Sequence, residues 1–192
     1  MSDTNVVKNV SAGKPNADGA IYRAPIGTPL PTDASTALAA AFNPLGYVSE
    51  DGLTDSKTLE TENIKSWGGV VVLTTQTERS DTFKLTLIES LNVDVLKTVH
   101  GDSNVSGALA TGLTVRSNAD ELPASVYVIE LALREGAKKR IVIPNGKITE
   151  LGDVTYVDND VVGYPITISA NAGGFASDND TYKEYIVRAA ST

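Results

Sequence analysis

Hydrophobic and polar residues alternate most clearly in residues 67–90, "WGGVVVLTTQTERSDTFKLTLIES". From Phe83 to Leu87 every second residue is apolar, and Val70 and Val72 lie on one side of the preceding piece. This period of two is typical of a β-sheet with one buried face and one solvated face. The pattern predicts two pieces of β-strand joined by a polar turn.

The same alternation predicts strands along much of the remaining chain. Polar clusters rich in Gly, Asn and Asp separate them and indicate turns, including one at Asn145-Gly146. An extended run with three prolines begins at Ile21, and Tyr47-Val48 begins another short strand. The other candidates are residues 113–117, 125–133, 139–144, 147–157, 162–170 and 182–189. About nine strands are expected.

Two segments have the pattern of short helices. In residues 32–42, Thr32 or Asp33 is a capping residue, and alanines dominate up to Phe42. In residues 90–101, apolar residues recur at helical spacing, and the closing glycine is a common helix end.

These elements predict a mainly β, α+β fold: an antiparallel β-sandwich or barrel with one or two short flanking helices. Residues 20–192 form a single domain, preceded by an N-terminal arm at 1–19 that either is disordered or becomes ordered against a neighbouring subunit. Between Tyr47 and Trp67 the chain makes a long acidic excursion, at about 49–63. We interpret it as a solvated loop whose length indicates a contact role.

Composition excludes several kinds of site. The chain has no cysteine, so disulfides, thiolate catalysis and cysteine-bound zinc are excluded. The formal net charge is −8, which opposes binding to nucleic acid along an attractive surface because phosphates require a basic patch. The N-terminus lacks the pattern of a signal peptide, and no apolar run is long enough to cross a bilayer. We expect a protein made in the cytoplasm, without a membrane partner.

The sequence offers only weak candidates for a catalytic or metal-binding site. His100, the single histidine, comes at the end of a predicted helix, where the helix dipole favours a cation, and we expect a structural role there. Residues 158–163 resemble a calcium loop only partly, because Val162 and Ser169 stand where ligands are required. A catalytic pair of carboxylates, as in glycoside hydrolases, stays open as an alternative, yet no pair stands out among 24 acidic residues. We expect no enzyme, no cofactor and no metal site.

Three ordered stretches resemble the major tail proteins, or tail tube proteins, of long-tailed bacteriophages of the siphophage type, especially those of actinobacterial phages. The first is "APIGTPLPTDASTALAAAFNPLGYVSEDGLTDSKTLETENIKSWGGVVV" at residues 24–72. It is followed by "TLIESLNVDVLKTVHG" at residues 86–101 and by "RIVIPNGKITELGDVTYVDNDVVGYPITISA" at residues 140–170. The resemblance spans roughly residues 20–170 in order.

The resemblance implies a structural subunit of the virion tail, assembled in the host cytoplasm. Such subunits form stacked hexameric rings around a channel that conducts genomic DNA without binding it specifically. The implied partners are further copies of the chain and the tape-measure, tail-tip and tail-terminator proteins. An open sheet edge, which invites pairing with another chain, gives this reading a physical basis.

The residues expected at subunit or ring interfaces are the apolar residues of the arm, the acids of the excursion and the single tryptophan: Val6, Val7, Val10, Glu50, Asp51, Asp55, Glu60, Glu62 and Trp67. Two other functions stay open. A carbohydrate-binding β-sandwich of a phage or cell surface would use Trp67 as a stacking platform, although a core or interface role is favoured. A hydrolase on a jelly-roll scaffold is the third, because the sandwich fold does not choose among these functions.

Overall fold

The computed structural model of the protein describes residues 10–16, 20–177 and 179–188. Within them lie eleven strands, one α-helix and two 3-10 turns, η2 (Asp102–Asn104) and η3 (Arg134–Gly136). The strands are β1 (Lys14–Pro15), β2 (Ile21–Pro25), β3 (Asn43–Pro44), β4 (Thr54–Lys65), β5 (Val71–Leu87), β6 (Val105–Ala108), β7 (Gly112–Val115), β8 (Ser125–Ala132), β9 (Lys138–Leu151), β10 (Tyr164–Ala170) and β11 (Lys183–Val187). The helix is α1 (Val93–His100).

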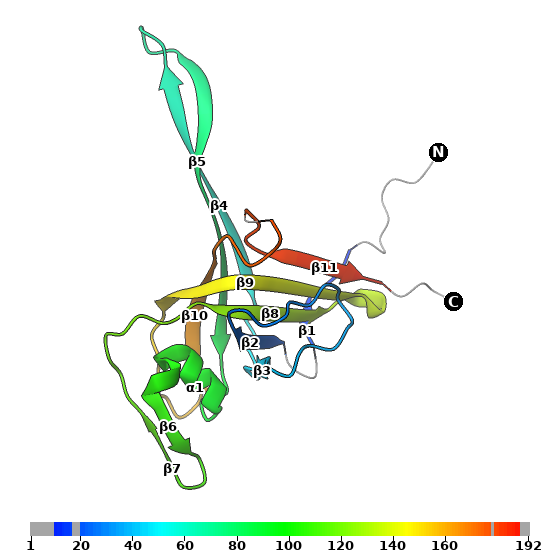
Figure 1. Cartoon of the computed structure of the whole chain (residues 1–192). Helices are drawn as coiled ribbons and strands as arrows, with labels where there is room; N and C mark the ends of the chain where they lie inside the picture. The colour runs from blue at the N-terminus through cyan, green and yellow to red at the C-terminus, as the bar shows by residue number, and fades with distance from the viewer. Residues whose placement is uncertain (1–9, 17–19, 178, 189–192) are drawn as a thin grey trace.

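One antiparallel sheet holds nine of these strands. Its order is β3-β2-β8-β9-β10-β5-β4, with β1 paired to β8 and β11 paired to β9, while β6 and β7 form a separate hairpin. The strands that run across the view in Figure 1, β8, β9 and β11, cross those that run upward, β10, β5 and β4. The mainly antiparallel β fold expected from the sequence is confirmed.

The main core lies where the two crossing halves of the sheet face each other. It contains Phe83 and Leu87 of β5, Ile129 of β8, Ile141 of β9 and Ile168 of β10, all at most 2% exposed. Burial therefore follows the alternation that the sequence shows in the inner part of β5, and this prediction is confirmed.

Helix α1 closes one end of this core, as expected for residues 90–101. Asn92 caps it by accepting a hydrogen bond from the Asp94 backbone N–H at 2.9 Å. Gly101 ends it with φ 93°, and its N–H donates to the Lys97 carbonyl. Val95 and Val99 point into the core. His100 is the last residue of the helix, and its ring packs edge-on against Tyr164.

The prediction of a helix at residues 32–42 is wrong. Asp33 does accept hydrogen bonds from the backbone N–H groups of Ser35 and Thr36, both at 2.6 Å. A hydrogen bond from the Thr36 hydroxyl, together with these two backbone bonds, lowers the pKa of Asp33 well below the usual range. However, the Asp33 carbonyl, which would accept the first bond of a helix, accepts from the Arg140 guanidinium at 2.8 Å. The alanine-rich segment crosses the sheet as a loop, and this bond ties its start to β9.

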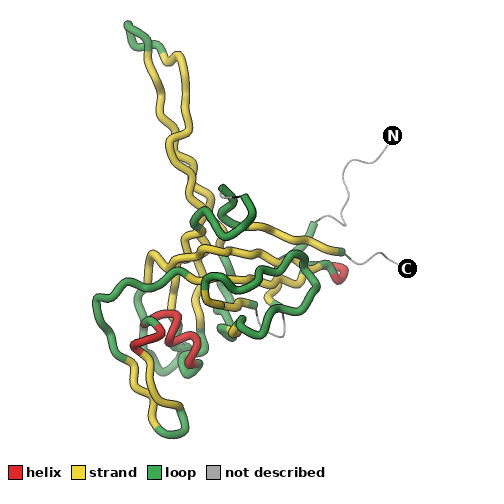
Figure 2. Tube along the Cα trace, in the orientation of Figure 1, coloured by secondary structure: helices red, strands yellow, loops and turns green. Residues whose placement is uncertain are grey.

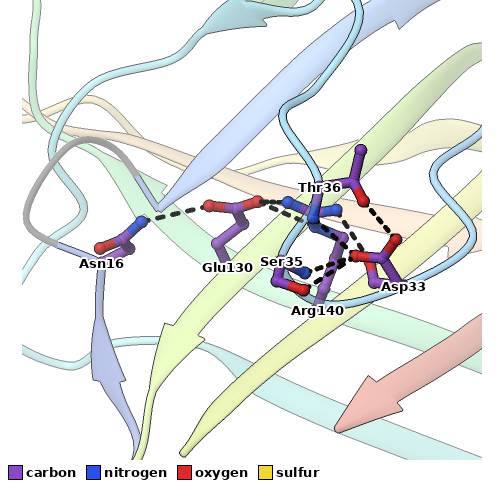
Figure 3. Close-up of polar contacts among 6 residues, drawn as sticks. All are labelled: Asn16, Asp33, Ser35, Thr36, Glu130 and Arg140. Atoms are coloured by element: carbon purple, nitrogen blue, oxygen red, sulfur yellow. Dashed lines mark hydrogen bonds and ion pairs between the residues drawn. The ribbon is translucent and has the colours of Figure 1, made fainter. Parts of the chain in front are cut away.

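Arg140 anchors this loop from a buried position in β9 (Figure 3). Its Nε donates to Glu130 Oε1 at 2.8 Å, and Glu130 Oε2 accepts from Asn16 Nδ2 at 3.2 Å. The guanidinium thus joins the loop at Asp33 to strands β8 and β9. Phe42 ends the loop in a second apolar cluster with Val128.

The prediction of a turn at Asn145-Gly146 is also wrong, because strand β9 continues through both residues. Gly146 lies against the ring of Tyr127, and a Cβ there would come within 2.5 Å of that ring. The glycine therefore provides space for a close contact between strands instead of a turn.

Two expectations about the acidic region and the following strand are corrected. The excursion at 49–63 is not a loop over most of its length, because residues from Thr54 onward form the strand β4. Likewise, the polar turn expected within residues 67–90 is absent: β5 is a single strand of 17 residues. The two strands pair with each other along the whole of β4. The N-terminal arm lies largely outside the described residues, and its described part, residues 10–16, contains β1.

Candidate assembly surface

A long two-stranded ribbon leaves the body of the subunit (Figures 1 and 2). At Asp81, which faces Ala170, the last residue of β10, strand β5 pairs with β10 on one side and with β4 on the other. Residues 71–80 of β5 pair with β4 alone. We therefore call residues 58–80 the projecting hairpin. At about 3.3 Å per residue, residues 58–65 reach roughly 25 Å from the body. The register shifts between Glu60 and Thr61 and again between Ile64 and Lys65, and such bulges increase the twist of a ribbon.

The end of the projecting hairpin is a glycine turn. Gly69 N–H donates to the Ser66 carbonyl at 2.9 Å, and Ser66 N–H donates to the Val70 carbonyl at 2.8 Å. Gly68 and Gly69 have φ of 114° and 88°, a region that favours glycine. The two glycines leave Trp67 at the tip, with its side chain fully exposed.

Apolar side chains gather toward this tip without a core to receive them. We call them the tip patch: Ile64, Trp67, Val70, Val71, Val72 and Leu73, each between 47% and 107% exposed. Because successive side chains of a strand point to opposite faces, these residues lie on both faces of the ribbon. Exposed large hydrophobic residues gathered at the end of an element that contributes little to the body are typical of a surface that another molecule covers.

Carboxylates occupy one face of the middle of the projecting hairpin. Glu60 lies directly opposite Glu78, and Glu62 follows two residues along β4 on the same side as Glu60. All three side chains are exposed. Like charges opposite each other destabilise a strand pair, so this arrangement does not serve the stability of the ribbon.

The outer edge of β4 is open. β4 is the last strand of the sheet order, so within the described part of the chain its outer side has no strand partner over Thr54–Lys65. Open edges of this length present backbone N–H and C=O groups to any extended chain that approaches.

The structure places the sequence-predicted interface residues in three regions. Glu60, Glu62 and Trp67 lie on the projecting hairpin, and Asp55 is near its base, where it pairs with Lys57. Glu50 and Asp51 are exposed in the turn before β4.

Among the arm residues of this set, Val10 is the one that the structure describes, and it lies apart from the projecting hairpin. Val10 is exposed near β1, while Val6 and Val7 lie outside the described residues. Whether any of these residues contacts a neighbour stays a prediction.

Sequence reasoning missed the tip patch as a unit and missed Glu78. The signal was present: four consecutive apolar residues, Val70 to Leu73, follow a pair of glycines. It was interpreted as part of a sheet with a dry face, since the sequence does not reveal that this piece of strand lies beyond the body.

The described residues contain no cluster of three or more His, Asp or Glu side chains placed to hold a metal ion. No helix in the described part of the chain is long and apolar enough to cross a membrane.

One comparison with known proteins shows the family of this chain. The family model described as phage tail tube protein matches residues 9–187, and the chain therefore belongs to the phage tail tube proteins. It is a structural component of a phage tail, in a family whose members are not normally enzymes.

A solved structure described as the anti-feeding prophage cap, a tube terminating cap, is similar over 98% of this chain and 100% of its own, with 11% identity and a TM-score of 0.41. No curated protein matches the sequence.

Proposed function

We propose that this chain is the tail tube subunit of a siphophage-type tail, close to those of actinobacterial phages, and that it assembles into stacked hexameric rings whose acidic channel conducts DNA. The observation that carries the proposal is the projecting hairpin of a chain that belongs to the tail tube family: a long ribbon with an open edge and an apolar end. The tape-measure, tail-tip and tail-terminator proteins are its further partners.

The open edge of β4 supports self-association. Unpaired backbone groups along Thr54–Lys65 gain hydrogen bonds when a strand of a neighbouring copy lies beside them. A heterologous contact of this kind closes into a ring when its rotation closes, and stacked rings make a tube. The Val, Leu and Ile residues of the tip patch are 47–68% exposed in the subunit, so each that becomes fully buried contributes about half of the ~1.5–3 kcal/mol that burial of a whole side chain provides.

The acidic face supports passage of DNA without adhesion. A ring of six copies carries six times the formal charge of −8. Duplex DNA carries one phosphate per ~1.7 Å of its axis, and salt screens the repulsion beyond ~8 Å. Glu60, Glu62 and Glu78 therefore repel DNA at close approach if this face lines the channel.

Electron microscopy of the concentrated, purified protein tests the proposal directly. We expect rings or tubes in negative stain, and loss of them in Trp67→Ala and Leu73→Ala variants, because both side chains are exposed in the isolated subunit and reach their neighbours only in the assembly. Ala110→Ser, an exposed change on the β6–β7 turn, is the control. A protein that stays monomeric under all conditions contradicts the proposal.

The exposed Trp67 favours one second candidate, a carbohydrate-binding module, since an exposed aromatic ring can stack on a sugar. A glycan array distinguishes the two functions. Binding that is lost in Trp67→Ala, from a protein that forms no rings, supports the carbohydrate-binding module.

A further inference from the structure

Asp81 is the outermost position of the buried face of β5. It continues the row Phe83, Leu85 and Leu87, and its side chain is fully buried, although it is a carboxylate. It also marks the rung at which β5 pairs with both Ala170 of β10 and Lys57 of β4. Beyond it the three-stranded sheet becomes the two-stranded projecting hairpin.

A buried carboxylate in such a place needs polar partners, because burying an unpaired charge is costly. Thr181 Oγ1 donates to Asp81 Oδ2 at 2.8 Å, and the exposed Arg79 lies 3.5 Å from Oδ1. Oδ1 has no hydrogen-bond partner among the described residues. Thr181 belongs to the segment before β11, so a distant part of the chain holds the point where the projecting hairpin begins.

The neighbouring residue, Tyr182, contacts both β4 and β5 just below the base of the projecting hairpin. The Tyr182 ring meets Phe83 edge-on with 5.2 Å between centroids. Lys57 Nζ lies 5.4 Å from the centre of the same ring. Hydrogen bonds to Asp55 and Tyr182 raise the pKa of Lys57 above its usual value. β4 and β5 are thus both held by Thr181 and Tyr182.

We propose that Thr181 and Tyr182 form a clasp on the base of the projecting hairpin, which fixes the direction in which the hairpin leaves the body. Without the clasp the ribbon is joined to the body only through strand pairing, and two-stranded ribbons are twisted and weak on their own. Asp81 is a positioning residue: it gives the clasp an acceptor at the boundary between the dry core and the solvated ribbon. That a fixed direction of the hairpin serves tube assembly rests on the proposed function, whereas the clasp itself is a property of the single subunit.

The clasp can be tested by distance measurement, because the chain has no cysteine of its own. Spin labels at Gln76→Cys on the hairpin and Lys138→Cys on the body, both exposed positions, report the direction of the ribbon. Labelled subunits are diluted with unlabelled protein so that each distance belongs to one copy. We expect a narrow distance distribution in the parent, and a distribution at least twice as broad in Thr181→Val and Asp81→Asn.

Thr181→Val keeps the size of the side chain and removes only the hydroxyl, so it tests the clasp even if Asp81→Asn does not fold. Asp153→Asn makes the same chemical change as Asp81→Asn at an exposed position and must leave the distribution unchanged.

Hydrogen exchange supplies the second readout. In Thr181→Val, amides at the base of the hairpin should exchange about fivefold faster, the factor that corresponds to loss of one ordinary hydrogen bond. Amides of β8 and β9 should be unchanged.

Equal distance distributions in parent and Thr181→Val overturn the clasp, as does faster exchange spread evenly over the body. If the parent forms tubes but the distributions are equal, the clasp alone fails. If the distributions broaden but the parent forms no tubes, the proposed function fails.

Discussion

The two halves of β5 differ although they belong to one continuous strand. From Asp81 to Leu87 every second side chain is buried, whereas from Val71 to Glu78 only Thr75 is even partly covered. Both halves contain valine, leucine or phenylalanine, so hydrophobicity alone does not decide burial. What differs is the second neighbour: β10 pairs with the inner half, and its last residue, Ala170, lies opposite Asp81.

The comparison teaches that the inner half supports the fold and that the outer half is available for contacts. Because no residue of the projecting hairpin is buried, apolar residues at its end can be exposed without loss of contacts in the core. Predictions that separate stability from assembly therefore test the division at Asp81.

The largest expected effect comes from a matched pair in β5. Leu87 is fully buried and Leu73 is 53% exposed. Leu87→Ala should lower the free energy of unfolding by about 2–5 kcal/mol, because it leaves a cavity in the core. Leu73→Ala should lower it by no more than about 0.5 kcal/mol, as for most surface substitutions. Urea denaturation of the two variants measures both. A similar loss in each variant would show that the outer half supports the fold after all.

Alkaline pH should lower the stability of the body, because Tyr127 is buried there as a neutral phenol. Burial raises the pKa of this phenol from 10.0 to about 12, because the core disfavours the phenolate. The folded state thus keeps a proton that the unfolded chain loses above pH 10. The stability that this provides is fully present below pH 10 and is lost as the pH rises toward 12, by about 3 kcal/mol in total.

Tyr127→Phe cannot ionise at this position and is the matched control. Its stability should fall less between pH 10 and 12 than that of the parent, as measured by thermal unfolding at a series of pH values. Identical pH profiles would show that Tyr127 does not titrate in this range.

The smallest expected effect concerns the acidic face of the projecting hairpin. Glu78→Lys replaces a like-charge pair with Glu60 by an opposite-charge pair. The ribbon should gain about 0.2–1 kcal/mol locally, visible as slower amide exchange near Glu60, while the body is unchanged. Glu78→Gln, which only removes the charge, should give a smaller gain. Faster exchange in Glu78→Lys would mean that the two side chains do not face each other.

The candidate surface was only partly predictable. Glu60 and Glu62 were singled out as interface residues because they lie in a long acidic excursion whose length indicates a contact role, and Trp67 because it is the single tryptophan. Their placement on a strand, instead of a loop, was missed. β4 is nearly all polar, and a polar strand shows no alternation; it is recognisable only from its pairing with β5.

The failed helix shows the same limit in the body. Composition and a capping aspartate favour a helix at 32–42, and the cap does form. Arg140, more than a hundred residues away, donates to the Asp33 carbonyl and holds the segment as a loop against the sheet. Local helix propensity is a weak preference, and contacts with distant parts of the chain override it here.

The sequence by itself determined what depends on neighbours along the chain. The alternation from Phe83 to Leu87, the capped helix that ends at Gly101, the antiparallel β class and the motifs shared with tail tube proteins are all local patterns. Only the tertiary structure decided where the body ends, which apolar residues stay exposed and why a carboxylate is buried at Asp81. These features depend on which strand lies beside another, and that is set by contacts between residues far apart in the chain.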